Sequence, residues 1–117
     1  FNIINFTDMG TDIKFAVIHS FFDNPLEVWV KWNLPFLPRA GEDVNGWVWI
    51  DKNLRREDIM DNLTTEGKRN LAQWNGDLSD WLYEVGIVAG TVSSVSYYEK
   101  KDKKGEIYAI VWLKEDE

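Results

Sequence analysis

Several segments of this chain alternate apolar and polar side chains with a period of two, which is the pattern of a β-strand with one buried face. Residues 12–22, DIKFAVIHSFF, are rich in β-branched and aromatic side chains. Residues 26–34, LEVWVKWNL, continue the pattern after the turn signal Asp-Asn-Pro. We therefore expect an antiparallel β-hairpin. The first segment also fits a helix that begins at residue 11 or 12, because three of its apolar residues recur every four positions.

The segment LPFLPRAGEDVNGWVWI, residues 34–50, interrupts the alternation with two prolines and a glycine. Proline has no backbone N–H for a ladder, so the chain must leave the sheet or follow its edge here. Gly41 permits the positive φ that a tight corner needs. Over residues 44–50 we expect a further strand, with Trp47 and Trp49 on one face and aliphatic residues on the other.

The apolar spacing lengthens after residue 51 and predicts a helical stretch over residues 53–84. Asn53 is the candidate N-cap of a short amphipathic helix, and a second helix begins near Thr64 or Thr65. Asp77, with Asp80 three residues further on, resembles a capping arrangement for a third helix.

Glycines accompany the return to strand patterns. We expect Gly86 to end the third helix, and the strand that follows to contain a bulge near Ser93 or Ser94, where the alternation slips by one residue. The charged run KKDKKG predicts a hairpin loop in which Gly105 supplies the turn. Both faces of the last segment, residues 106–113, are apolar, so we expect it to be a central strand.

Together these elements predict one α+β domain over residues 1–117. Its sheet is antiparallel, or curls into a small barrel, and has about five strands. An insertion of two or three helices, residues 53–84, covers one face or one end of that sheet. The length of 117 residues is typical of one domain, and an apolar content of 44% suffices for a core.

The run PFLPRAGEDV, followed later by a V-x-x-V-x-Y strand, a charged turn and a terminal strand, resembles a pattern in short uncharacterised bacterial and phage-associated proteins. In that group proline, arginine, glycine and an acid introduce a strand of a small β-barrel. The resemblance spans about half of the chain and implies that residues 53–84 are an insertion. It implies a small barrel fold and no particular activity.

The charge balance is acidic, with 20 Asp and Glu against 13 Lys and Arg and a net charge of −7. Such a chain repels phosphate backbones and anionic lipid heads, so we expect no nucleic acid and no membrane as a partner. A basic protein partner fits this sign better. No apolar run reaches the roughly 20 residues that a membrane-spanning helix needs.

The chain contains no cysteine, which excludes a disulfide framework, a thiolate zinc site and a cysteine nucleophile. The residues determine neither the compartment nor the oligomeric state. We favour the cytoplasm; because the chain starts at Phe1 rather than Met, a removed signal peptide is the alternative. The glycosylation sequons at Asn5 and Asn62 matter only in a secretory pathway.

Motifs that indicate catalysis are missing from the sequence. His19, the single histidine, shares a strand face with apolar residues, which is typical of a structural histidine. No paired-histidine spacing indicates a metal, so we predict neither a metal nor another cofactor. Whether the domain is an enzyme stays open. A hydrolase that uses two carboxylates is a third reading, behind two binding functions.

The remaining signal is aromatic, because the chain has seven tryptophans. On a strand face they become core where helices cover them, and a recognition surface where the face is open. We predict a non-catalytic binding domain with a protein partner, or alternatively a carbohydrate-binding module. The candidate contact residues are Trp29, Lys31, Arg39, Glu42, Trp47, Trp49 and Trp112.

Overall fold

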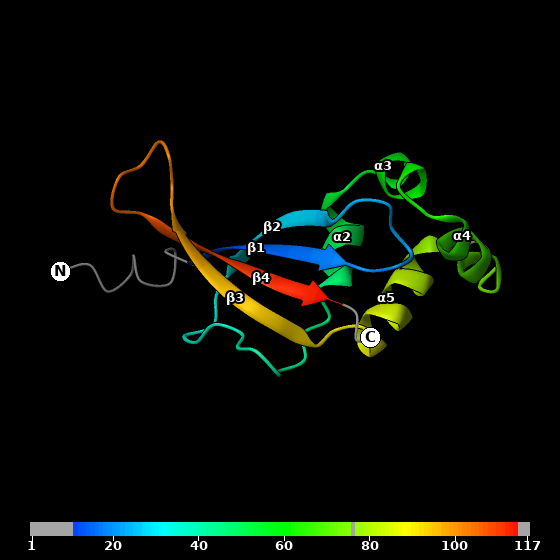
Figure 1. The fold of residues 1–117 in the computed structure, drawn as a ribbon, viewed down its shortest axis with the longest axis horizontal. Coiled ribbons are helices and arrows are strands. Elements are labelled where there is room, and N and C mark those ends of the chain that lie inside the picture. Colours follow the sequence, from blue (N-terminus) through cyan, green and yellow to red (C-terminus); the bar gives the residue numbers. More distant parts are fainter. Residues whose placement is uncertain (1–10, 76, 115–117) are drawn as a thin grey trace.

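Four strands form an open sheet with the order β2-β1-β4-β3 in the computed structural model, which describes residues 11–75 and 77–114 (Figure 1). The strands are β1 (Thr11–Ile18), β2 (Leu26–Trp32), β3 (Val92–Glu99) and β4 (Ile107–Lys114). β1 with β2 and β3 with β4 are antiparallel hairpins, and the hairpins meet along the parallel pair of β1 and β4. The expected α+β class is therefore confirmed, with a sheet that does not close into a barrel.

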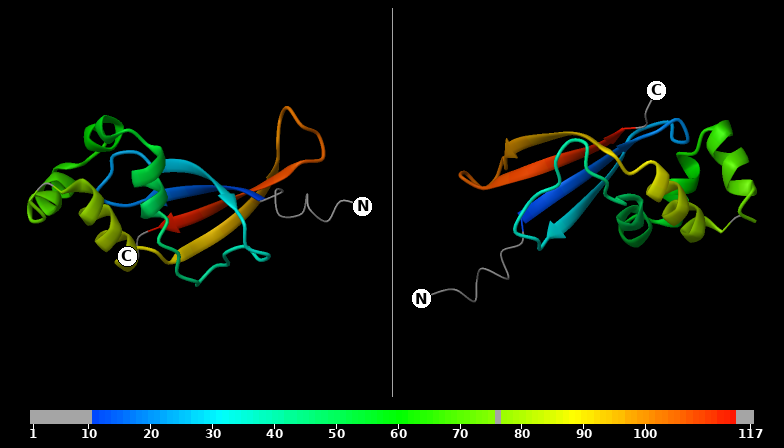
Figure 2. Two further views of the ribbon diagram at one scale, coloured as in Figure 1. Left: turned by 180° about the vertical axis from the view of Figure 1, so that it is seen from behind. Right: turned by 90° about the horizontal axis from the view of Figure 1, so that it is seen from below.

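Helices occupy the stretch between the two hairpins. They are α2 (Trp47–Asn53), α3 (Arg56–Asp61), α4 (Thr65–Ala72) and α5 (Leu78–Val88). All of them lie toward one end of the sheet and on one side of it (Figure 2). We call the sheet face on that side the inner face and the opposite one the outer face. The inner face is buried and carries Ile13, Phe15, Val17, Leu26, Val28, Ala109, Val111 and Leu113.

The expectations for the strands are largely confirmed. The segment from residue 12 is a strand rather than a helix, and it pairs with β2 in a hairpin. β4 is central, since β1 lies on one side of it and β3 on the other. The register of β3 and β4 shifts between Val92 and Ser94, which is the expected bulge. Gly41 has a φ of 90° at the corner after β2, as its place in the sequence predicted.

The strand that we expected at residues 44–50 is wrong, because Trp47–Asn53 forms the helix α2. Trp47 and Ile50 are three residues apart, so a helix turns both of them toward the core, where both are fully buried. Seven residues rich in Trp, Val and Ile fit either period, and packing decides between them. In this chain α2 packs against α5 and the inner face, and contributes no strand pairing.

Two helix boundaries also differ from the sequence prediction, whereas two caps agree with it. Asn53 is the last residue of α2, and α3 begins only at Arg56. The Thr64 side chain accepts a hydrogen bond from the Gly67 N–H at 3.0 Å, at the start of α4. Asp77 caps α5 by accepting from the Asp80 N–H at 3.1 Å.

Gly86 does not end α5, which continues to Val88. Its role is close packing: a Cβ at Gly86 would lie 2.7 Å from the Trp47 Cβ and 2.0 Å from the Asn45 Oδ1. α5 can therefore approach the start of α2 only because this residue lacks a side chain.

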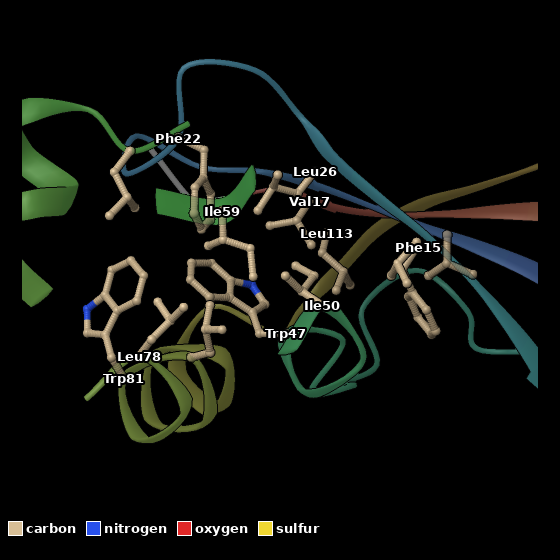
Figure 3. Close-up of a cluster of buried hydrophobic side chains, with 14 of the residues drawn as sticks. Phe15, Val17, Phe22, Leu26, Trp47, Ile50, Ile59, Leu78, Trp81 and Leu113 are labelled. Atoms are coloured by element: carbon tan, nitrogen blue, oxygen red, sulfur yellow. The ribbon is translucent and has the colours of Figure 1, made fainter. Parts of the chain in front are cut away.

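Buried aromatic rings join the helices to the sheet (Figure 3). The ring centroid of Trp47 lies 5.1 Å from that of Phe22, in the loop after β1, and 6.0 Å from that of Trp81 on α5. The Trp81 Nε1 donates to the Asn70 Oδ1 at 2.8 Å, so this indole is also tied to α4. The core is thus one cluster shared by the sheet end and the helices.

Replacement of Gly86 by alanine tests this packing. We expect Gly86→Ala to lower the free energy of unfolding by about 1–3 kcal/mol, although alanine is the better helix former, because the added methyl group collides with Trp47 and Asn45. Urea unfolding measures the change. The matched control is Val88→Ala on the same helix, where the side chain is 85% exposed and a change within about 0.5 kcal/mol is expected. Equal values for both variants would show that α2 and α5 do not pack this closely.

Candidate functional site

The outer face of the sheet carries a row of aromatic rings from three strands, of which the outer two are exposed and the middle one, Tyr108, is half-buried. Trp29 on β2 is 51% exposed and Tyr98 on β3 is 45% exposed, with Tyr108 of β4 between them. Ring centroids are 5.1 Å apart for Trp29 and Tyr108, and 5.7 Å for Tyr98 and Tyr108. We call these three residues the aromatic cluster. No helix covers this face among the described residues (Figure 2).

The strand register explains why these rings meet. Tyr98 lies directly opposite Tyr108 in the antiparallel pair of β3 and β4. Trp29 lies opposite Lys14, and the Lys14 Nζ is 5.4 Å from the Trp29 ring centroid, within the range of a cation–π contact. The same ammonium group is 2.8 Å from the Glu27 Oε1. The aromatic cluster is thus held in place by its cross-strand neighbours.

Asp12 is the centre of a charged network beside the aromatic cluster. The Lys31 Nζ lies 2.9 Å from its Oδ1, and the Lys100 ammonium donates a hydrogen bond to its Oδ2. The hydrogen bond from Lys100, and after it the one from Lys31, lowers the pKa of Asp12 below its ordinary value of 3.8. The same bond raises the pKa of Lys100. The network therefore stays charged at neutral pH and ties the loop after β3 to β1 and β2.

A surface cavity of about 420 Å³ opens where the aromatic cluster meets this network. It is lined by Asp12, Trp29, Lys100, Lys101, Asp102, Lys103 and Tyr108. Within the described part of the chain, Lys101 forms no ion pair, so its ammonium group is available to a ligand. Aromatic walls and cationic ends suit an apolar group that carries or adjoins a carboxylate.

Three of the residues singled out from the sequence lie on this outer face. Trp29 lines the cavity, and Lys31 adjoins it through its ion pair with Asp12. Trp112 is on the same face of β4 as Tyr108, opposite Ala16 and Ser94, and is half-buried. It extends the face beyond the aromatic cluster.

Arg39 and Glu42 lie elsewhere, in the loop between β2 and α2. They bind each other: the Arg39 N–H donates to the Glu42 Oε1 at 2.6 Å, and the Arg39 guanidinium is 3.6 Å from the Glu42 Oε2. With Phe36, Leu37 and Tyr97 they line a separate groove of about 670 Å³.

Trp47 and Trp49 are not part of an exposed surface, which corrects their inclusion among the contact residues. Trp47 is 0% exposed and belongs to the core. Trp49 is half-buried and stacks on Phe15 of the inner face, with ring centroids 5.0 Å apart and planes within 7°. The burial of the two tryptophans has one cause. Residues 47–53 form the helix α2 under the sheet, so both indoles face inward.

Sequence reasoning missed Tyr98, Tyr108, Asp12 and Lys100 as members of the site. The alternation of β4 does indicate that Tyr108 and Trp112 share a face. What it does not indicate is that β4 lies next to β1, which brings Tyr108 beside Asp12. That adjacency joins residues almost a hundred positions apart.

His19 packs against aromatic rings at the end of β1, as expected of a structural histidine. Its Nδ1 accepts a hydrogen bond from the Phe21 N–H at 3.1 Å, and its ring lies 4.4 Å from the Phe21 ring and 5.3 Å from the Trp47 ring. A cavity of about 390 Å³ reaches it between α4 and α5. In the described ranges, no three His, Asp or Glu side chains come together in a way that could hold a metal ion.

Comparison of the chain with protein-family models, with curated proteins and with solved structures gave no match. Among residues 11–75 and 77–114, none of the helices combines the length and apolar character that crossing a membrane requires.

The Asp12 network predicts a pH-dependent stability. Because folding lowers the pKa of Asp12, its contribution is present above the ordinary value of 3.8 and is lost as pH falls through the lower pKa of the folded state. Because folding raises the pKa of Lys100 above 10.5, the contribution of this ammonium group is lost only when it deprotonates at a pH beyond that value. We expect Asp12→Asn to lower the free energy of unfolding by about 1 kcal/mol at pH 7.

Urea unfolding of wild type and Asp12→Asn across the pH range measures this difference. It should be constant from about pH 5 to pH 9, and it should shrink as pH falls below 3.8 toward the lower pKa of the folded state. Asp58→Asn, which removes an exposed pair with Arg55, is the control and should have the smaller effect at pH 7. A difference that persists in acid would show that the carboxylate charge is not its cause.

Proposed function

We propose that this domain is a non-catalytic binding module that contacts a protein partner through the outer face of its sheet. The observation that supports this is the aromatic cluster, whose rings Trp29 and Tyr98 are exposed on a face that the helices leave uncovered. Large aromatic side chains with a charged rim are the typical composition of the contacts that dominate protein–protein affinity. Because cross-strand neighbours hold these rings in place, binding costs less side-chain conformational entropy.

The net charge of the rim of this surface is opposite in sign to the net charge of the whole chain. Its cations are Lys14, Lys31, Lys100, Lys101 and Lys103, and its anions are Asp12, Glu27, Asp102 and Glu106. The net charge of −7 favours a basic partner for the molecule as a whole, whereas the outer face favours acidic side chains. We therefore propose that the segment of the partner that contacts the aromatic cluster is acidic.

The geometry favours a protein over a carbohydrate ligand. A sugar ring stacks on a flat, exposed aromatic platform, and two such platforms work together when they are coplanar. The planes of Trp29 and Tyr108 are inclined by 60°. Tyr98 and Tyr108 are nearer to parallel, at 28°, but they lie over each other. Such a surface suits side chains that insert between rings.

A hydrolytic function has less support in this geometry. A carboxyl group that acts as a general acid at neutral pH needs a raised pKa. In the described part of the chain, the carboxyl groups with a shifted pKa are Asp12 and Asp58, and a lysine or arginine neighbour lowers both.

The test begins with a photoreactive phenylalanine analogue at position 108, introduced in cells that express the protein naturally. The same analogue at Tyr83, which is 53% exposed on α5, is the matched control. A partner that cross-links at position 108 and not at position 83 is then purified, and its affinity is measured by calorimetry. We expect Trp29→Ala and Tyr108→Ala each to weaken binding about 30-fold or more, and Tyr83→Ala less than about threefold.

The same variants distinguish the alternatives. Binding to a glycan panel that Trp29→Ala abolishes would replace the protein partner with a carbohydrate. Cross-linking that is equal at positions 83 and 108 would remove the outer face as the binding surface.

A further inference from the structure

β3 forms one edge of the sheet, and this edge is open from Ser93 to Glu99. Before Ser93 the loop after β2 occupies the edge: the Gly41 N–H donates to the Val92 carbonyl at 2.9 Å, and the Val92 N–H donates to the Glu42 carbonyl at 2.8 Å. After Glu99 the hairpin turn begins. Among the described residues, β3 pairs only with β4, so the open segment spans residues 93–99.

The backbone of this segment offers hydrogen bonds to a further strand. In an antiparallel pair, successive residues direct their N–H and C=O groups alternately toward the neighbour and away from it. The Lys100 N–H donates to the Glu106 carbonyl at 2.9 Å, so this residue faces β4. Two-residue steps back along β3 then place the backbone groups of Val95, Tyr97 and Glu99 on the open side.

The side chains of this edge lack the usual protection against strand pairing. Natural edge strands carry lysine, proline or inward-pointing charges that discourage a second chain. Residues 92–98 read VSSVSYY, with neither a charge nor a proline. The opposite edge, β2, does carry charges at Glu27 and Lys31. The groove lined by Phe36, Leu37, Tyr97 and the ion pair of Arg39 and Glu42 lies beside the β3 edge on its inner side, where Tyr97 is 61% exposed.

We propose that β3 pairs antiparallel with β3 of a second copy of this chain. The open segment 93–99 is centred on Ser96, so full pairing of two copies places the two Ser96 residues opposite each other on the two-fold axis. Val95 then faces Tyr97 of the second copy, and Ser93 faces Glu99. The hydrogen bonds run between Val95 and Tyr97 of the two copies, because the backbone groups of both residues point outward.

The self-complementary and largely uncharged register, rather than the net charge, supports a second copy as the occupant. Two chains with a net charge of −7 repel each other over most of their surfaces, so they can meet only where charge is absent. In this register the one ionised residue of the segment, Glu99, faces a serine, and no like charges are opposed. The Val95 and Tyr97 contacts occur twice by symmetry and add apolar contact area on the inner side of the paired edge. Added salt should strengthen the dimer, because it screens the remaining repulsion.

Single cysteine variants test this register directly, since the chain has no cysteine of its own. In the proposed dimer the Cα atoms of the two residues 96 are about 4.5 Å apart, within the range for a disulfide. Ser94 is on the same face, but its two copies are four residues out of register, about 13 Å apart. Under mild oxidation Ser96→Cys should give a covalent dimer on a non-reducing gel, and Ser94→Cys should remain monomeric. Equal cross-linking of both variants, or stronger cross-linking at position 94, would overturn the proposal.

Sedimentation velocity of the wild-type chain provides a second, independent measurement. We expect a reversible monomer–dimer equilibrium between about 10 µM and 1 mM that tightens with salt. Ser96→Lys opposes two like charges on the axis and should weaken association at least tenfold, with circular dichroism confirming that it folds. Gln73→Lys makes the same charge change at the exposed C-cap of α4 and should associate as wild type does. A wild-type chain that stays monomeric up to 1 mM in high salt would refute the paired edge.

Discussion

The burial of Trp47 is the constraint on which the layering of this protein depends. This indole joins three parts of the chain, since it contacts Phe22 after β1 and Trp81 on α5 from its own place on α2. Its N–H has no hydrogen-bond partner among the described atoms, so its contribution is apolar packing, which for a buried aromatic ring is worth several kcal/mol. Because this contact draws the helices to the inner face, the outer face of the sheet keeps its aromatic rings in solvent.

Local patterns in the sequence predict most of the strands, but they do not predict how the helices pack against the sheet. The alternation of β1 and β2 is visible because each buries one face, and β4 is recognisable because both of its faces are apolar. α2 is not visible, since the alternation of Trp47 and Trp49 with Val48 and Ile50 fits a strand, while the three-residue spacing of Trp47 and Ile50 fits a helix. Gly86 misleads for a related reason: a glycine that allows close packing looks the same in a sequence as one that ends a helix.

The candidate site shows the same division between local and long-range information. Trp29 and Lys31 are recognisable because they alternate with the buried residues of their own strand. Tyr98, Tyr108 and Lys100 become neighbours of Asp12 only through the parallel pairing of β1 with β4, which no turn or short loop encodes.

The distribution of charge over the molecule also depends on the fold. Residues 55–84 carry seven acidic and four basic side chains, whereas residues 100–106 carry two acidic and four basic ones. These segments lie at opposite ends of the molecule (Figure 1), so its field can orient a charged partner before contact.

β3 belongs to both proposed surfaces, and this links them physically. Tyr98 faces outward within the aromatic cluster, while its neighbour Tyr97 faces the inner groove, and the backbone between them forms the open edge. Pairing of two β3 strands continues one sheet into the next with the same side outward, so both aromatic clusters come to lie on one surface. A partner with two acidic segments, or a partner that is itself a dimer, then meets both clusters at once. Its second contact forms at a high effective concentration, so modest affinity at each cluster suffices for a stable assembly.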